Sequence, residues 1–339
     1  MAPVKENETD TSDQGASSHS KRPTPALQMV EGILLPLFFD PDTARSGMAY
    51  KPRDDDVFVA TYAKCGTTWM QHIVFLLQHR GEPPSSVHDF FRSSTYIELL
   101  GSDVVGSLPG PRAIKTHLPV DRVPYDAKAK YIYVYRNPWD CVVSYYHHVK
   151  TIPLYRFQGT LDDLFEAFME GHCEDGDYFD HLVGWYGRRN DQNIFAISYE
   201  EMHADVRSSI LRVAEFMGEE YADMLREDEK VFQEILRCSS IEYMKVHTND
   251  TMREFFKMKR EDVLNHPTWV KSIKNIREGF AEGDADSLSL VRRGAVGKSA
   301  ETLDDQKIKR IRDKLEDKLR LAGLEMPESW KKLPYLTSS

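Results

Sequence analysis

The sequence predicts an α/β protein, a single domain in which helices flank a central parallel sheet. Short apolar segments alternate with longer helical ones along most of the 339 residues, and this alternation is typical of parallel sheets covered on both faces. Two strands lead directly into helices, at 56–79 and 131–150. In such sheets ligands bind beyond the carboxyl ends of the strands, so we expect both turns to lie at a binding site.

The individual elements follow from local patterns. β-branched and aromatic residues favour strands, and Asn137 and Pro138 suit the N-cap and first position of the helix after the second turn. The expected strands are 56–62, 113–116, 131–135 and 193–198. Helical spacing of apolar residues predicts helices at 69–79, 138–150, 161–169, 179–188, 206–217 and 301–321.

The domain is expected to span 26–330. Residues 1–25 are polar and lack the apolar stretch of a signal peptide, which indicates a disordered tail, and 331–339 are expected to form a C-terminal tail. The most apolar early run, 32–39, is too short to cross a bilayer.

Composition excludes several classes of function. The chain holds 44 Lys and Arg against 54 Asp and Glu, a net charge of −10, which disfavours binding to nucleic acid or to anionic membranes. The four cysteines are widely spaced, so we expect neither a zinc site nor a disulfide framework. A cytoplasmic protein without a metal fits best.

The turn after the first strand has the composition of an anion site. In VATYAKCGTTW, 59–69, Gly66 permits a tight path, Thr67 and Thr68 offer hydroxyl and amide groups at the helix start, and Lys64 adds a positive charge. A Walker A loop is excluded because the glycines of G-x-x-x-x-G-K-[ST] are absent. The alternative is that Thr67 only caps the helix and Lys64 points into solvent.

The second turn, YRNPWDCVVSYYHH at 135–148, also suits a phosphate. Arg136 ends the strand, and Ser144 lies on the helical face below it. The alternative is that Arg136 pairs with Asp140 and Ser144 only packs.

Together the two turns resemble the cytosolic sulfotransferases, over about 30–298. TYAKCGTTW resembles the family's 5′-phosphosulfate loop and YRNPWDCVVSYYHH its 3′-phosphate motif, IKTHLP at 114–119 resembles the segment with the catalytic histidine, and VRRG at 291–294 the C-terminal phosphate signature. The resemblance implies a fold related to P-loop nucleotide kinases. It also implies the donor 3′-phosphoadenosine 5′-phosphosulfate (PAPS), with 3′-phosphoadenosine 5′-phosphate (PAP) as the product.

The resemblance also implies which residues bind the donor. Those at the phosphosulfate end are Lys64, Cys65, Gly66, Thr67, Thr68 and Trp69, with Trp69 stacking on the adenine. Those at the 3′-phosphate are Arg136, Ser144, Arg292, Arg293 and Gly294. Tyr199, Ser239 and Ile241 are assigned to the base, although the family usually has threonine and phenylalanine at the last two positions.

For the transfer itself, the resemblance implies an in-line displacement without a metal. His117 can take the acceptor's proton because an imidazole titrates near neutral pH; a lone histidine is otherwise more often structural. Lys64 would stabilise the leaving phosphate, and Lys115 would assist at the sulfuryl group.

The expected acceptor is a small phenol or monoamine, with a steroid left open. The candidate pocket residues are Phe39, Phe90, Phe91, Tyr96 and Tyr146, whereas Phe38 and Phe179 are assigned mostly to the core.

The sequence departs from the family pattern in three places. The C-terminal signature continues as GKSA at 297–300, without the usual acidic residue and tryptophan. Near the family's dimerisation stretch Lys307 reverses a charge, so we expect a monomer or a weak homodimer. Cys65 replaces a common serine and is either an oxidisable thiol of lowered pKa or an inert buried one.

Two rival functions remain. A catalytically silent PAPS-binding protein would bind the donor without turnover. A nucleotide kinase, the less favoured rival, would depend on ATP and magnesium.

Overall fold

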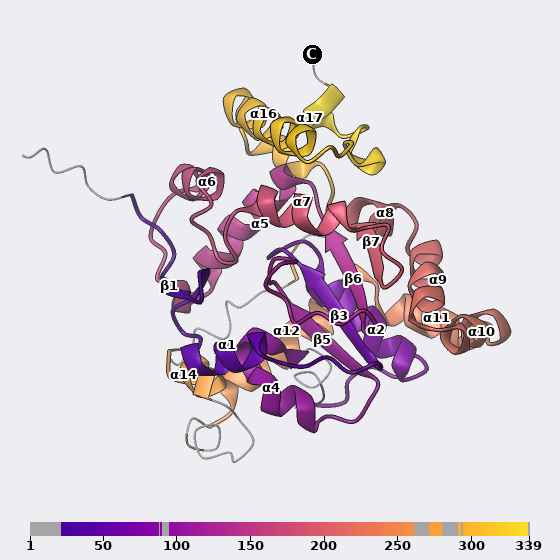
Figure 1. Ribbon diagram of the computed structural model, residues 1–339. Helices are drawn as coiled ribbons and strands as arrows, with labels where there is room; N and C mark the ends of the chain where they lie inside the picture. Colours follow the sequence, from indigo (N-terminus) through magenta and orange to yellow (C-terminus); the bar gives the residue numbers. More distant parts are fainter. Residues whose placement is uncertain are drawn as a thin grey trace, which may run out of the picture.

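A five-stranded parallel sheet forms the centre of the computed structural model, which describes residues 22–87, 89, 95–259, 261, 271–279, 291–292 and 294–337 (Figure 1). The strand order is β4–β5–β3–β6–β7, and every neighbouring pair is parallel. In that order the strands are Thr95–Tyr96, Arg112–Thr116, Asp56–Thr61, Lys130–Tyr135 and Ile194–Ser198. The expected fold class is therefore confirmed.

Helices cover both faces of the sheet. Those on one face are α2 (Thr67–Gln78), α9 (Val206–Met217), α10 (Glu219–Glu227) and α11 (Glu229–Cys238). Those packed against the other face or its rim are α1 (Pro41–Met48), α4 (Ile97–Ser107), α5 (Pro138–Thr151), α6 (Leu161–Met169), α7 (Tyr178–Gly187) and α16 (Asp305–Leu321).

Side chains of β3 alternate between the two cores. Val57 and Val59 join the cluster with α2 and α9, whereas Phe58 and Ala60 join the cluster with α5 and α7. A strand buried on both faces needs apolar residues at every position, which is why the segment shows no polar alternation.

The remaining elements flank this arrangement of one sheet between two layers of helices. A hairpin, β1 (Leu27–Val30) with β2 (Ile33–Pro36), is antiparallel. The other helices are α8 (Tyr199–Ala204), α12 (Ile241–Lys257), α14 (Lys271–Gly279) and α17 (Pro334–Thr337), with 3₁₀ turns η1 (Pro153–Tyr155), η2 (Lys298–Glu301) and η3 (Glu328–Trp330).

The four predicted strands and five of the six predicted helices lie within two residues of the expected bounds. The predicted cap is also confirmed, because the Asn137 side chain accepts from the Asp140 amide at 2.8 Å. The exception is the helix expected from 301, which begins at Asp305 after the η2 turn, where Asp304 caps it.

The C-terminal segment packs on the domain instead of forming a tail. Trp330, Leu333 and Tyr335 are buried, and the Tyr335 ring stacks on Trp139 of α5 with centroids 4.8 Å apart. The domain thus extends past 330, because these buried apolar side chains pack on it, and Figure 1 shows α17 next to α16. Of the expected N-terminal tail, residues 1–21 lie outside the described part.

Among the described residues, the search for a helix both long and apolar enough to cross a bilayer finds none.

Candidate active site

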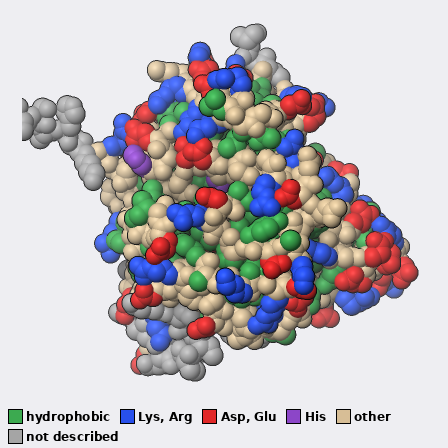
Figure 2. All heavy atoms as spheres, viewed as in Figure 1, with side chains coloured by type: hydrophobic (Ala, Val, Ile, Leu, Met, Phe, Trp, Pro, Cys, Tyr) green, Lys and Arg blue, Asp and Glu red, His purple; other side chains and the backbone are tan. Residues whose placement is uncertain are grey.

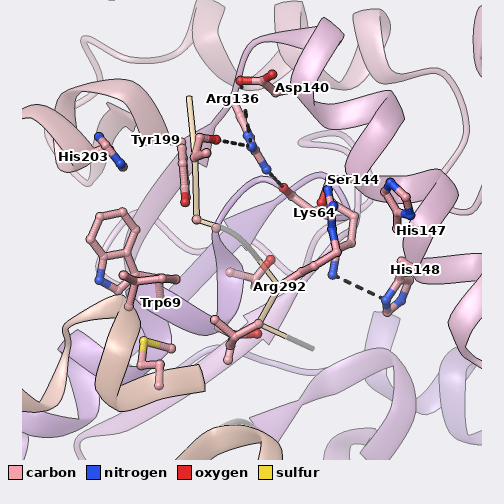
Figure 3. Close-up of a pocket in the computed structure, with 18 of the residues that line it drawn as sticks. Lys64, Trp69, Arg136, Asp140, Ser144, His147, His148, Tyr199, His203 and Arg292 are labelled. Atoms are coloured by element: carbon pink, nitrogen blue, oxygen red, sulfur yellow. Dashed lines mark hydrogen bonds and ion pairs between the residues drawn. The ribbon is translucent and has the colours of Figure 1, made fainter. Parts of the chain in front are cut away.

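One candidate side chain follows the carboxyl end of each of four neighbouring strands. His117 comes directly after β5, Arg136 directly after β6 and Tyr199 directly after β7, while Lys64 lies three residues beyond β3. Because parallel strands end at the same edge of a sheet, the four residues meet there and line a cavity of about 510 Å³. Figure 3 shows Lys64, Arg136 and Tyr199 among its lining.

The turn between β3 and α2 exposes backbone amides. Lys64 and Gly66 have positive φ angles of 68° and 103°, so the chain curls tightly before the helix. Gly66 is the N-cap and supplies no side chain, while the Thr67 hydroxyl bonds that of Thr61 at 2.6 Å. The first amides of α2 are therefore left without a side-chain cap, an arrangement suited to an anion.

Lys64 points into the cavity rather than into solvent. Its Nζ lies 3.4 Å from Nδ1 of His148, and Figure 3 shows the ammonium directed at that ring. Burial lowers the pKa of Lys64 to about 8, helped by the nearby charge of Lys115 and opposed by that of Glu174. The ammonium is thus less stable here than in water, and an anionic ligand would stabilise it.

His117 is held by its backbone and by its ring. Its amide donates to Oε1 of buried Glu98 at 2.7 Å, and Nδ1 lies 2.7 Å from the carbonyl oxygen of Thr61. Since a carbonyl only accepts, Nδ1 must carry the proton, which leaves the lone pair on Nε2. Burial, with a smaller contribution from Lys115, keeps the pKa of His117 well below its usual value, so the ring is neutral at pH 7.

Arg136 is fixed between two backbone carbonyls. Its guanidinium donates to Lys64 O at 3.3 Å and Ala295 O at 2.9 Å, and it lies 4.5 Å from the centre of the Tyr199 ring. The closest approach to Asp140 is 3.9 Å, a loose ion pair. Nε of Arg136 is buried and has no hydrogen-bond partner among the described residues.

Asp140 has a structural role that the sequence did not indicate. Its carboxylate accepts from the Gly297 amide at 2.7 Å, the Ser299 hydroxyl at 2.7 Å and the Tyr335 hydroxyl at 2.8 Å. These bonds fasten the segment after Gly294 over the cavity, because α5 and the C-terminal segment share one buried carboxylate.

Aromatic and aliphatic side chains line another part of the cavity. The rings of Trp69 and Tyr199 lie 5.4 Å apart at 67°, and Nε1 of Trp69 is buried without a partner among the described residues. Gly294 has φ 63° and approaches Ile241 so closely that an added Cβ would lie 2.5 Å from that side chain.

Most of the predicted donor-binding and catalytic residues come together in this cavity. Those that line it are Lys64, Gly66, Thr67, Thr68, Trp69, Lys115, His117, Arg136, Ser144, Tyr199, Ser239, Ile241, Arg292 and Gly294. Arg293 lies outside the described residues.

Cys65 is the exception in the first turn. Its sulfur is buried 3.8 Å from that of Cys141, and its amide is already bonded to the Tyr62 carbonyl. Burial raises the pKa of the Cys65 thiol well above its usual value. The inert thiol, rather than the oxidisable one, therefore matches the structure, and the side chain belongs to the core beneath the turn.

The described acceptor candidates, Phe39, Tyr96 and Tyr146, are not among the residues that line this cavity. Phe39 is buried against Tyr96 with ring centroids 5.4 Å apart, and Tyr146 packs against Phe157. Tyr96 nevertheless contacts the reactive groups, with Lys115 Nζ 3.8 Å from its ring centre and the His117 ring at 5.1 Å. Phe90 and Phe91 lie outside the described residues.

Three contributors near Lys64 were missed. His148 follows Ser144 by one helical turn, a spacing that could have identified it. Glu174 comes from the loop between α6 and α7, and Tyr155 from η1; no local pattern marks either. His148 and Glu174 line the cavity, and Tyr155 bonds Glu174 at 2.5 Å.

The amides and side chains that line the cavity fit a nucleotide, which carries anionic phosphate groups and an aromatic base. Uncapped amides, Lys64 and Arg136 can hold phosphate groups, the Trp69 and Tyr199 rings can contact a base, and the buried unpartnered nitrogens of Arg136 and Trp69 call for hydrogen-bond acceptors.

Comparison with known sequences agrees with this chemistry. A model of the sulfotransferase domain matches residues 54–323. Sulfotransferase 1C2 of rat is 34% identical over 258 residues, 73% of this chain and 77% of that protein, and its human counterpart is 31% identical over 282 residues, 80% and 85%. Rabbit amine sulfotransferase is 36% identical over 201 residues, 58% and 65%.

Solved structures share the fold. A mouse sulfotransferase complexed with PAP has a TM-score of 0.63 at 24% identity, covering 87% of this chain and 94% of that one. Retinol dehydratase in complex with androsterone and inactive cofactor PAP has a TM-score of 0.62 at 22% identity, covering 88% and 90%.

Proposed function

The chain belongs to the sulfotransferase family and is a sulfotransferase, and on this premise we propose that it uses PAPS to sulfonate a small phenol or monoamine. The single observation that carries the proposal is the meeting of Lys64, His117, Arg136 and Tyr199 at adjoining strand ends. The PAP bound by the mouse sulfotransferase and by retinol dehydratase supports the choice of donor.

The donor would lie along the described cavity. The amides at the start of α2 and Lys64 would hold the phosphosulfate end, and Arg136 with Ser144 would hold the 3′-phosphate. Arg292, Arg293 and Gly294 are assigned to the same phosphate, and the residues assigned to the base are Trp69, Tyr199, Ser239 and Ile241.

His117 would serve as the general base. Its Nδ1–H is engaged with the Thr61 carbonyl, so Nε2 is available for the proton of an acceptor hydroxyl or amine. When bound, PAPS would supply an activated sulfuryl group: the acceptor oxygen or nitrogen attacks its sulfur in line, and the bond to the bridging phosphate oxygen breaks so that PAP leaves. Lys64 would stabilise the charge that develops on the leaving phosphate, and Lys115, whose Nζ lies over Tyr96, would assist beside it.

The class of acceptor is proposed from the side chains near His117 and from what similar proteins bind. An amine sulfotransferase is among the relatives, and retinol dehydratase binds retinol and androsterone. Tyr96, in contact with both His117 and Lys115, supports an acceptor with an aromatic ring. We assign Phe39, Phe90, Phe91 and Tyr146 to the same pocket or its second layer.

We further propose that the enzyme is cytoplasmic, metal-independent, and a monomer or a weak dimer. The four cysteines are free and buried, as expected in a reducing compartment. Near the family's dimerisation stretch, Leu303 is buried and Lys307 pairs with Asp162 and Asp304, so these side chains are engaged within the chain.

The proposal is tested by transfer of radiolabelled sulfate from PAPS to a panel of phenols, monoamines and steroids, with EDTA present and ATP absent. We expect labelled phenol or monoamine products. In a parallel assay without PAPS, phosphorylated product that depends on ATP and Mg²⁺ would indicate a kinase, and PAP binding without product for any acceptor would indicate a silent binder.

A further inference from the structure

Four side chains form a continuous series of polar contacts at the edge of the cavity. Nζ of Lys64 lies 3.4 Å from Nδ1 of His148, Nε2 of His148 lies 3.5 Å from the Tyr155 hydroxyl, and that hydroxyl lies 2.5 Å from Oε2 of Glu174. The His148 and Tyr155 rings are also in edge contact, with centroids 5.5 Å apart. The series joins a cation to a carboxylate through one neutral imidazole.

The hydrogen bonds of this series all run in one direction, from Lys64 toward Glu174. An ammonium only donates, so Nδ1 of His148 must accept and its proton must reside on Nε2. Nε2–H then donates to the Tyr155 oxygen, and the Tyr155 hydroxyl donates to the Glu174 carboxylate. Hydrogen bonds aligned in one direction polarise one another, which strengthens the whole series.

The surroundings oppose the charge on Lys64. Lys115 and Arg136 face it from the ends of β5 and β6, and both lower its pKa, whereas Glu174 raises it. Burial together with Lys64 and Lys115 keeps the pKa of His148 well below its usual value, so this ring is neutral and can accept. His117, also neutral, lies on the same side of the cavity.

We propose that His148 is a positioning residue for Lys64: with Tyr155 and Glu174 it orients the ammonium along the cavity and keeps it protonated before the donor binds. The two contacts of the imidazole are long, so an incoming phosphate can replace His148 at little cost. The inference rests on the proposed function, in which Lys64 acts on the donor.

The first test needs no donor. In enzyme labelled with ¹⁵N-histidine, we expect Nδ1 of His148 to be unprotonated and Nε2 protonated at pH 7, with the signals assigned by His148→Phe. Lys64→Met should shift the Nδ1 resonance. The opposite tautomer, or a resonance unchanged in Lys64→Met, would overturn the inference.

The second test is a double-mutant cycle of kcat/KM for PAPS. We expect His148→Phe to lower kcat/KM about tenfold in the wild-type background and less than about twofold in Lys64→Met, because His148 acts through Lys64. His148→Asn, whose side-chain oxygen can replace Nδ1, should recover to within about threefold of wild type, whereas His148→Gln should not. An equal loss in both backgrounds would show a merely structural role.

Tyr155→Phe tests the hydrogen bonds of the series separately from the packing of the ring, because it removes the hydroxyl and keeps the ring. In the pH profile of kcat/KM, we expect the alkaline limb to shift to lower pH by about 0.5 pH unit or more in Tyr155→Phe and in Glu174→Gln. An unchanged limb would contradict the inference. If Lys64→Met itself were fully active, the proposed role of Lys64 would fail; if it were inactive while His148→Phe equalled wild type, only the present inference would fail.

Discussion

His117 illustrates how one backbone contact can prepare a side chain for chemistry. The bond from Nδ1 to the Thr61 carbonyl fixes the neutral tautomer. Glu98 holds the segment around His117, because its carboxylate accepts from the Thr116 hydroxyl and from the His117 and Leu118 amides. A general base needs a free lone pair and a defined direction, so these contacts support the role proposed for His117.

Replacing His117 with alanine should therefore slow transfer without preventing donor binding. We expect kcat to fall by about 10²–10⁴-fold, the usual contribution of a general base, while PAP affinity measured by calorimetry changes less than about threefold. His172→Ala, at an exposed surface position, is the control and should behave as wild type. A parallel loss of PAP affinity would assign His117 to donor binding instead.

The pH profile should reflect two shifted groups. Burial keeps the pKa of His117 well below its usual value, so the proposed base is neutral at pH 7 and the acid limb should lie below the usual range of a histidine. Lys64, with a pKa of about 8, loses its positive charge as pH rises through that value, so kcat/KM for PAPS should fall there.

Bound donor is anionic and raises the pKa of Lys64, so the alkaline limb of kcat should lie at higher pH than that of kcat/KM. Lys64→Arg keeps its charge and should lose the limb. A limb near pH 8 that persists in Lys64→Arg would assign it to another group.

Single residues were predictable where a local pattern carried their role. Lys64, Gly66 and Arg136 stand at strand-to-helix turns, which the sequence marks, and they line the cavity. Cys65 could not be placed, because one turn directs Lys64 into the cavity and buries the next side chain in the core. Glu174 lies far along the chain from Lys64, so only the tertiary fold brings the two together.

At the scale of the element, the β3–α2 turn depends on glycine for two separate reasons. Gly66 has a φ of 103°, and an added Cβ would lie 2.8 Å from the Tyr199 ring. The first reason is backbone conformation, and the second is the close approach of α8 to the turn.

Gly66→Ala should accordingly cost more than backbone strain alone. Gly323, with φ 66° and nothing within 4 Å of an added Cβ, provides the matched control, for which we expect a loss of about 1–2 kcal/mol in unfolding free energy. Gly66→Ala should exceed this loss and weaken PAP binding at least about tenfold. Equal losses in urea titrations, with PAP binding intact, would contradict the close approach.

The elements that were predicted carry a clear periodicity, whereas several others, including the amphipathic helices α11 and α12, were not foreseen. β3, β6, α5 and α9 carry apolar residues at regular spacing and lie where expected. The β1–β2 hairpin and α1 were not foreseen, because four-residue strands and an eight-residue helix carry too little pattern and are defined by tertiary contacts.

For the whole molecule, a chain of negative net charge gathers several cations in its cavity. Figure 2 shows Lys and Arg interspersed with Asp and Glu over the face in view, consistent with a net charge of −10. Lys64, Lys115 and Arg136 instead gather at the strand ends, together with Arg292. The proposed anion binding would thus depend on the fold, which concentrates a few cations, rather than on composition.

The C-terminal segment connects global stability with the cavity. The Tyr335 hydroxyl accepts from the Ser299 amide at 3.1 Å and donates to Asp140, next to the segment that carries Gly294. Tyr335→Phe should cost about 1–3 kcal/mol of unfolding free energy, because buried Asp140 loses a donor and the Ser299 amide loses one of its two acceptors.

Tyr335→Ala also loses the stacking on Trp139 and should cost about 3–5 kcal/mol. Both variants should weaken PAP binding. Tyr125→Phe removes an exposed hydroxyl that bonds Asn193 and is the control, with a change below about 0.5 kcal/mol. Full stability of Tyr335→Ala in urea unfolding would show that the segment is not part of the domain.

The most direct measurement is a calorimetric titration of the wild-type protein with PAP in EDTA, followed by ATP with Mg²⁺ in a separate titration. One PAP per chain should bind, at least about tenfold more tightly than ATP, because Arg136 and Ser144 are expected to hold a 3′-phosphate that ATP lacks. Tighter binding of ATP, or no heat with PAP, would contradict the assignment of the strand-end cavity to the donor.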